Sequence, residues 1–316
     1  MSKLLKAASS PHIRHQDTTT GIMLDVFFAL LPAAAFGCVI FGLKALFVLL
    51  VTTGTAILAE YLWNLILKRP QTVGDMSAAV TGLLLGMNLS SKTPLWVAAI
   101  GSIAAIIVVK QMFGGLGYNF VNPALSARVI LLVSFPSFMT KFGEPITDTL
   151  TSATPLANAD GFTLKTLFFG MHSGCIGETG AFLILLGGIY LLVRRVINPI
   201  IPLSFIGTVA LLAAVSGLVT GEANLGVYVL KYILSGGLIL GAVFMATDYV
   251  TSPTANWGKL IFGIGCGAIT FVIRRFGSLP EGVSYSILIM NILTPLINRI
   301  PFSRPFGFIK EVKENA

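Results

Sequence analysis

Ten apolar runs, separated by short polar breaks, extend over almost the whole chain. They lie at 22–42, 45–67, 76–90, 95–113, 119–138, 179–195, 200–219, 225–246, 258–273 and 283–298. The hydrocarbon core of a bilayer is about 30 Å thick and takes about 20 apolar residues in a helix. We therefore predict an all-α integral membrane protein with about ten transmembrane helices.

The composition supports this class. Of 316 residues, 55% are hydrophobic and 11% are charged, whereas soluble domains carry about 25% charged residues. Ten spans with short loops use up such a chain, so we interpret residues 1–316 as a single polytopic membrane domain. The formal net charge is +8, but the basic residues follow the ends of apolar runs and form no stripe, which argues against a nucleic-acid partner.

The basic residues also predict the orientation in the membrane. They close the second, fourth and sixth runs at Lys68, Arg69, Lys110, Arg194 and Arg195. Because positive residues favour the cytoplasmic side, we expect cytoplasmic termini, with an arm at 1–20 and a tail at 300–316, in a multi-pass protein of the cell inner or plasma membrane. The loop at 139–162 then lies outside. Arg274 and Arg275 contradict the rule, since they also fall outside, and indicate either a topology error or an anionic partner.

Two parts of the chain look alike, at about 74–123 and 236–282. Each has an irregular apolar run, a polar break, a run that begins near a Trp, a basic end and a Gly-rich turn. The parts start on opposite sides of the membrane, so the pattern predicts an inverted repeat with broken helices and a site between the halves. The alternative is that Gly-rich membrane helices resemble one another by composition.

Two polar segments at the cytoplasmic side carry candidate ligand-binding residues. In the first, Gly114 and Gly115 allow close backbone approach while Asn119 and Asn122 donate and accept hydrogen bonds, which suits a flavin or quinone ring. The alternative is a tight turn in which Asn122 caps the next helix. In the second segment, Thr247 and Asp248 could bind a flavin or coordinate Na⁺. Its alternative is an ordinary helix cap and turn.

Two carboxylates lie within apolar runs, where burial of charge is costly. Asp25 is near the cytoplasmic end of its run and can reach water. Glu60 is the better candidate for ion or proton handling, with a structural hydrogen-bonding role as the alternative. Cysteines occur at Cys38, Cys175 and Cys266 without a CxxC pair, so we predict no metal site.

The extracytoplasmic loop contains a segment rich in hydroxyl groups that ends at Pro155. Its residues are Asp148, Thr149, Leu150, Thr151, Ser152, Ala153 and Thr154. Pro155 biases Thr154 toward an extended conformation, which presents the hydroxyl on a loop. A threonine presented in this way can carry a covalent group.

These residues and several other motifs resemble one known family. Asp148-x-x-Thr151-Ser152-Ala153-Thr154 is similar to the DxxSGAT-type signature of proteins modified with FMN, with Ser152 in place of Gly. Further motifs in the same order are Phe113-Gly114-Gly115-Leu116-Gly117, Asn122-Pro123-Ala124, Ala246-Thr247-Asp248 and Thr251-Ser252-Pro253. Along nearly its whole length, the chain resembles the family that contains the D subunits of Rnf ion-translocating oxidoreductases and the B subunits of Na⁺-translocating NADH:quinone reductases.

The resemblance implies two flavin cofactors. FMN is expected in a phosphoester with Thr154, installed by a separate flavin transferase that recognises a sequence including Asp148. Riboflavin is expected in the helical bundle, near Asn119 and Asp248. Arg274 and Arg275 could then approach the flavin phosphate.

The resemblance also implies a function in a complex. The chain is expected to relay electrons, surrounded by membrane lipid, in an enzyme that couples ferredoxin and NAD redox chemistry to translocation of Na⁺ or H⁺. The expected partners are the A, B, C, E and G subunits of the Rnf complex, and no residue of this chain is expected to be catalytic by itself. The alternative is a secondary transporter or channel with inverted repeats and no redox cofactor, in which Glu60 and the broken helices form the substrate path.

Overall fold

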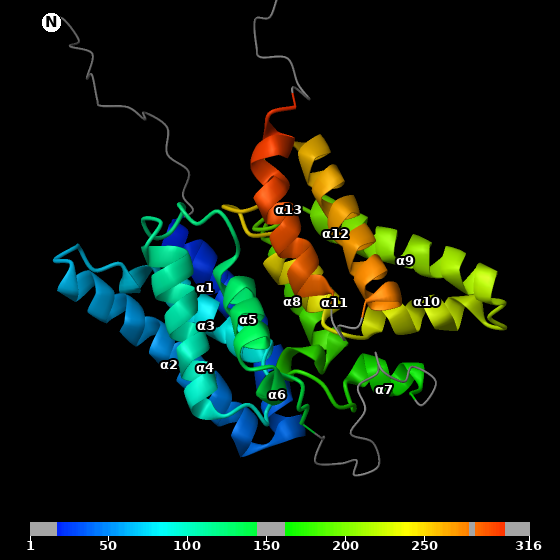
Figure 1. The fold of residues 1–316 in the computed structure, drawn as a ribbon, viewed down its shortest axis with the longest axis horizontal. Helices are drawn as coiled ribbons and strands as arrows, with labels where there is room; N and C mark the ends of the chain where they lie inside the picture. Colours follow the sequence, from blue (N-terminus) through cyan, green and yellow to red (C-terminus); the bar gives the residue numbers. More distant parts are fainter. Residues whose placement is uncertain (1–17, 144–161, 278–281, 301–316) are drawn as a thin grey trace, which may run out of the picture.

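The computed structural model describes residues 18–143, 162–277 and 282–300. Apart from one isolated bridge between Gly143 and Gly174, these residues form helices, turns and loops. The thirteen helices labelled in Figure 1 are α1 (Thr19–Phe41), α2 (Leu43–Ile66), α3 (Ser77–Met87), α4 (Leu95–Ile103), α5 (Pro123–Ser134), α6 (Pro136–Met139), α7 (Leu164–Phe169), α8 (Ala181–Val193), α9 (Ile200–Thr220), α10 (Leu225–Leu234), α11 (Leu238–Leu240), α12 (Asn256–Phe276) and α13 (Val283–Asn298).

Two helices continue as π-helical segments. The segment η2 (Ala104–Gln111) extends α4, and η5 (Gly241–Met245) extends α11. Short 3₁₀ turns are η1 (Val73–Asp75) and η4 (Ile176–Glu178). Each of the ten predicted apolar runs therefore contains helix, and the prediction of an all-helical protein is confirmed for the described residues.

Fewer of the described helices are long enough to cross a membrane than the ten that the sequence pattern predicts. In the described part of the chain, α1, α2, α9 and α12 are long and apolar enough to cross a membrane. A fifth span results if α10 and Leu238–Met245, which are bent by 64°, count as one broken helix. Ten spans are not confirmed, because helices such as α3, with 11 residues, reach only about half of the hydrocarbon thickness at 1.5 Å per residue.

Two short helices lie entirely inside the bundle. All residues of α3 and of Leu238–Met245 are buried, as expected for helices that are apolar on every side. Each follows a residue in the left-handed conformation, Met76 or Gly237, both at φ 64°. The helical chain is interrupted between α10 and α11, with a bend of 64°, which agrees with the prediction of broken helices.

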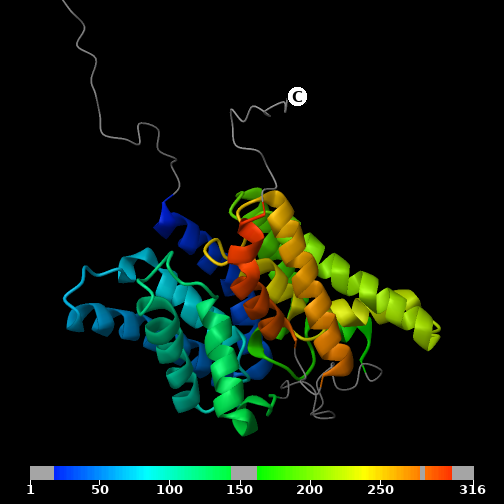
Figure 2. The same ribbon diagram turned by 45° about the horizontal axis from the view of Figure 1, so that its top comes forward.

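The helices are arranged in two groups. Figure 1 shows α1 to α6 on one side and α9 to α13 on the other, with α8 packed against α1. Turned by 45°, Figure 2 shows that the start of α1 and the end of α13 lie on the same side of the molecule. This agrees with termini on one side of a membrane.

Glycine allows the helices to approach closely. A Cβ added at Gly82 would lie 2.7 Å from the Thr52 carbonyl oxygen of α2, and one at Gly267 would lie 2.8 Å from the Phe205 carbonyl oxygen of α9. Such small-residue contacts are the usual means by which membrane helices pack. They bring α3 against α2, and α12 against α9.

Candidate functional site

A recess opens between the two groups of helices. Its cavity volume is about 90 Å³, and it opens to solvent at one side; small-molecule sites usually have about 300–1,000 Å³. Its lining is mostly apolar, and its polar members are Ser77, Thr81, Lys110, Asn119, Asn122, Thr247 and Asp248. We call it the central pocket. Two segments more than a hundred residues apart in sequence thus meet at one site.

The structure brings together four of the candidate residues. Asn119 and Asn122 come from the loop before α5, and Thr247 and Asp248 come from the loop after η5. Gly114 and Gly115 lie in the same turn as Asn119, with φ angles of 121° and 95°, but they do not line the pocket. Their left-handed conformations shape the turn, as glycine permits.

Asn122 has a structural role as well as a place in the pocket. Its Oδ1 accepts hydrogen bonds from the amides of Ala124 and Leu125, at 3.1 and 3.2 Å, so it caps α5. Its Nδ2 donates to the Met245 carbonyl oxygen at 3.2 Å. The expected helix cap is therefore present, and it also ties the end of η5 to the start of α5.

Asp248 lies in a turn at the other wall of the pocket. Its Oδ2 accepts a hydrogen bond from Thr251 Oγ1 at 3.1 Å. Burial raises the pKa of the Asp248 carboxyl above its ordinary value, and the hydrogen bonds from Thr251 and from the Val250 amide partly oppose this rise. The pocket is thus lined by one carboxyl group and two amide side chains.

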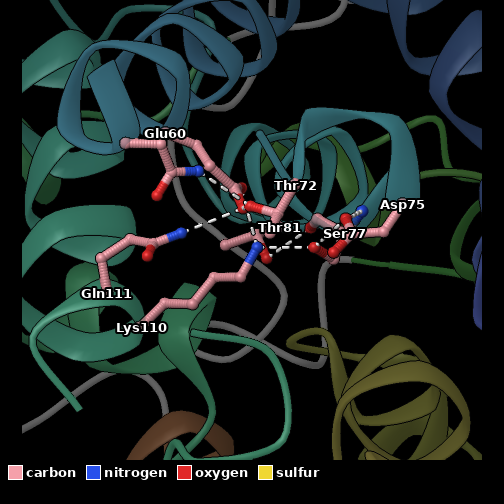
Figure 3. A network of polar contacts seen from close by, with 8 residues as sticks. Glu60, Thr72, Asp75, Ser77, Thr81, Lys110 and Gln111 are labelled. Carbon is pink, nitrogen blue, oxygen red and sulfur yellow. Dashed lines mark hydrogen bonds and ion pairs between the residues drawn. The ribbon is translucent and has the colours of Figure 1, made fainter. Parts of the chain in front are cut away.

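A buried ionic network adjoins the pocket (Figure 3). Glu60 of α2 is 0% exposed and Lys110 of η2 is 2% exposed, and the Lys110 ammonium lies 2.8 Å from Glu60 Oε2. Glu60 Oε1 accepts hydrogen bonds from Thr72 Oγ1 at 2.6 Å and from Gln111 Nε2 at 3.0 Å. Both carboxylate oxygens are therefore satisfied, as a buried charge requires.

The network continues to the start of α3. The Lys110 ammonium donates to Ser77 Oγ, and the Ser77 hydroxyl and amide both donate to Asp75 Oδ1. The π-helical turn brings consecutive side chains, Lys110 and Gln111, onto the same carboxylate. Such turns frequently occur at functional sites.

The sequence analysis identified Glu60 but assigned Lys110 only a topological role. The available signal was a lysine followed by a polar amide inside an apolar run. A second missed residue is Arg128 of α5, which is 4% exposed. Its guanidinium donates to Asn88 Oδ1 and to Cys175 Sγ, and an arginine within the apolar run at 119–138 was itself a signal.

Arg274 has partners other than the expected anion. Its guanidinium donates to the carbonyl oxygens of Tyr232, Ser235 and Gly236, at 2.8 to 2.9 Å. These carbonyls lie at the C-terminal end of α10, where the helix breaks and its last backbone groups have no intrahelical donors. The side chain therefore caps a broken helix. Arg275 is exposed.

Asp25 forms a surface ion pair. Its Oδ2 lies 3.1 Å from Arg194 NH2, and its Oδ1 accepts from Tyr190 Oη at 2.8 Å. The side chain of Arg194 is 55% exposed. Asp25 is therefore close to solvent, as its position near the end of the run predicted.

The residues of the expected covalent flavin site lie outside the described part of the chain. They are Asp148, Thr151, Ser152, Ala153 and Thr154. FMN attachment at Thr154 therefore stays a prediction. Within the described ranges, no group of three or more His, Cys, Asp or Glu side chains could hold a metal ion.

A helical membrane protein with broken helices and a polar-edged pocket between two helix groups is the class that this geometry defines. The profile of the NQR2, RnfD, RnfE family matches residues 6–307, so the chain belongs to that family. It is 46% identical to the D subunit of the Na⁺-translocating ferredoxin:NAD⁺ oxidoreductase complex of Acetobacterium woodii, over 98% of both chains.

Two further relatives have related names. The D subunit of the proton-translocating ferredoxin:NAD⁺ oxidoreductase complex of Clostridium ljungdahlii is 41% identical over 95% of both chains. The D subunit of the ion-translocating oxidoreductase complex of Stutzerimonas stutzeri is 40% identical over 90% of this chain and 91% of its own. The predicted family is confirmed.

Proposed function

We propose that the chain is the D subunit of a membrane-bound, ion-translocating ferredoxin:NAD⁺ oxidoreductase complex and relays electrons through two flavins. The observation that carries this proposal is the central pocket, which joins Asn119, Asn122, Thr247 and Asp248 beside a buried ion pair. Near full-length similarity to components of such complexes supports the reaction class.

The residues of the pocket fit a riboflavin ring system. The apolar walls, which include Leu84 and Phe244, suit the faces of a flat aromatic ring, and the amides and carboxyl at the edge can pair with its carbonyl and imide groups. A flavin bound there would supply reversible electron transfer. The protein supplies a pocket whose polar side chains can orient the ring by hydrogen bonds.

The covalent FMN rests on the sequence motif. Thr154 is followed by Pro155 in a polar segment of the sequence, and Asp148 stands at its expected place. Thr151 occupies the Ser/Thr position of the signature, and Ser152 replaces its Gly. A flavin transferase is the implied maturation partner. Outside the membrane, FMN on this loop could exchange electrons with another component of the complex.

The inverted repeat is part of the proposal. Its structural support is that α3 and Leu238–Met245 are both wholly buried and both begin after a residue at φ 64°. The central pocket lies between the two groups of helices, as sites between inverted repeats do. We further propose cytoplasmic termini and contacts with the A, B, C, E and G subunits of the Rnf complex. Relatives are named for Na⁺ or for proton translocation, and the coupling ion of this chain is Na⁺ or H⁺.

The experiment separates the two flavins. In cells that contain the transferase, a denatured and washed band of the wild-type chain should fluoresce as flavin, Thr154→Ala should abolish that fluorescence, and Thr149→Ala, in the same loop, should keep it. Acid extraction followed by chromatography should release riboflavin from the native protein, and Asn119→Ala with Asp248→Asn should reduce this amount at least tenfold. A band without fluorescence and an extract without riboflavin would favour a transporter without redox cofactors.

A further inference from the structure

The side chain of Lys110 adjoins two sites at once. Its ammonium is 2.8 Å from Glu60 Oε2, and the same residue lines the central pocket. Among the described residues that line the pocket, Lys110 is the single cation and Asp248 the single carboxylate. Asp248 accepts its hydrogen bonds from its own turn. Lys110, the cation that a ligand in the pocket would meet, is therefore already paired with Glu60.

The Lys110 ammonium donates to two oxygen atoms, Glu60 Oε2 and Ser77 Oγ. Besides the carboxylate, the oxygens of Thr72 and Ser77 lie in the same network, and Asp75 follows behind Ser77 (Figure 3). Carboxylate and hydroxyl oxygens are the ligands that hard cations prefer. The Lys110 ammonium occupies the place that such a cation would take. A carboxylate with no exposed surface cannot remain there without a positive partner, since an unpaired buried charge is strongly destabilising.

We propose that Lys110 couples the charge of the flavin in the central pocket to the cation bound by Glu60. This inference rests on the proposed function. On reduction, a ligand in the pocket gains negative charge. This charge attracts the Lys110 ammonium, which can move because it is carried on a flexible four-carbon stem. Glu60, with Thr72 and Ser77, then takes up one small monovalent cation. No covalent bond changes and Lys110 keeps its protons, so one added electron in the pocket is balanced by one added cation at Glu60.

Coupling of this kind is reciprocal. If reduction of the flavin promotes cation binding at Glu60, the cation must promote reduction by the same factor. The midpoint potential of the pocket flavin therefore rises with the concentration of the coupling cation. A lysine that only stabilises the fold gives no such dependence.

The test measures that potential by spectroelectrochemical titration of the purified complex. A Thr154→Ala background removes the signal of the covalent flavin, and NaCl is varied against choline chloride at constant ionic strength. We expect the potential to rise with Na⁺ when Lys110 and Glu60 are both present. Lys110→Met should lower the potential and make it independent of Na⁺, because the positive charge is lost and the cation affinity of Glu60 no longer differs between the two redox states.

Glu60→Gln should shift the potential in the opposite direction. It frees the ammonium for the pocket, so the potential rises and again ignores Na⁺. If the substitutions only loosened the packing of the pocket, Lys110→Met and Glu60→Gln would not shift the potential in opposite directions. Lys92→Met, an exposed lysine away from the central pocket, is the matched control and should leave the potential and its Na⁺ dependence unchanged.

The remaining outcomes are also decisive. If neither single variant folds, the double variant Glu60→Gln/Lys110→Met, which removes both charges, replaces them, and a Na⁺-dependent potential in it overturns the proposal. If the potential does not depend on Na⁺ when Lys110 and Glu60 are both present, the cation taken up should be a proton. A pH-indicator dye should then record proton uptake on reduction, and Glu60→Gln should abolish this uptake. Absence of both effects, with riboflavin still extractable, overturns the coupling alone. Absence of riboflavin overturns the proposed function and the coupling with it.

Discussion

The two groups of helices use a basic residue differently, and that residue is buried in the first group and half-buried in the second. In the first group, Lys110 pairs with a carboxylate and a hydroxyl at the edge of the central pocket. In the second group, Arg274 donates to three backbone carbonyls at the break after α10. Arginine, with its planar set of five donors, suits several fixed acceptors, whereas lysine is a point charge on a flexible stem. The comparison therefore sets a fixed structural cation in the second group against the cation of the first group, which we propose to be movable.

The largest effect is expected from loss of the movable charge. In choline-based buffer, Lys110→Met leaves Glu60 buried and unpaired, which should reduce stability by about 3–5 kcal/mol. Unfolding in an SDS titration, followed by circular dichroism, measures this change. The double variant Glu60→Gln/Lys110→Met should recover most of the loss, because the residues act as a pair. Equal losses in the single and double variants would show that packing of the lysine stem, and not its charge, is responsible.

Loss of the fixed cation should have a smaller effect. Arg274→Gln removes donors from the carbonyls at the end of α10, and buried acceptors without donors cost about 1–3 kcal/mol. The neighbouring Arg275→Gln, on an exposed side chain, is the control and should change stability little. The same SDS titration distinguishes the two. If Arg275→Gln were the more damaging change, the cap at the break would not be the role of this basic pair.

The sequence predicted where helices form but not how they are interrupted. Apolar runs locate helices well, because burial and lipid both favour apolar side chains. Four of the polar residues that line the central pocket lie in the two polar segments chosen as candidates. The ion pair between Glu60 and Lys110 joins residues 50 positions apart. This ion pair depends on a π-helical turn, which the spacing of hydrophobic residues does not reveal. The role of Arg274 likewise depends on the break between α10 and α11, whose angle is set by packing.

The starts of the two buried helices offer a comparison at equal backbone conformation. Gly237 and Met76 both have φ 64°, a conformation that costs a residue with a Cβ about 1–2 kcal/mol. Gly237→Ala should therefore destabilise the protein by about that amount. Gly226→Ala, in α10 with open space around it, should be neutral or slightly stabilising. A cost at Gly226 that equals the cost at Gly237 would contradict the conformational explanation.

Met76→Gly should act in the opposite direction. It relieves a strained conformation and should stabilise the protein by up to about 1 kcal/mol, because glycine adopts positive φ readily but loses more chain entropy on folding. Thermal unfolding in detergent, monitored by the exposure of buried cysteines to a thiol dye, detects the change. A loss of stability would show that the Met76 side chain contributes packing that outweighs its strain.

The smallest effect concerns the surface ion pair. Arg194→Gln removes the partner of Asp25, but Arg194 is 55% exposed, and ion pairs near solvent contribute about 0–1 kcal/mol. In the SDS titration, Arg194→Gln should reduce stability by less than about 1 kcal/mol. A higher salt concentration should abolish the difference between the variant and the unsubstituted protein, because exposed charges are screened. A loss as large as that of Lys110→Met would mean that Asp25 is desolvated in the membrane-embedded protein. The ion pair of Asp25 and Arg194 would then stabilise the protein as much as the buried pair of Glu60 and Lys110.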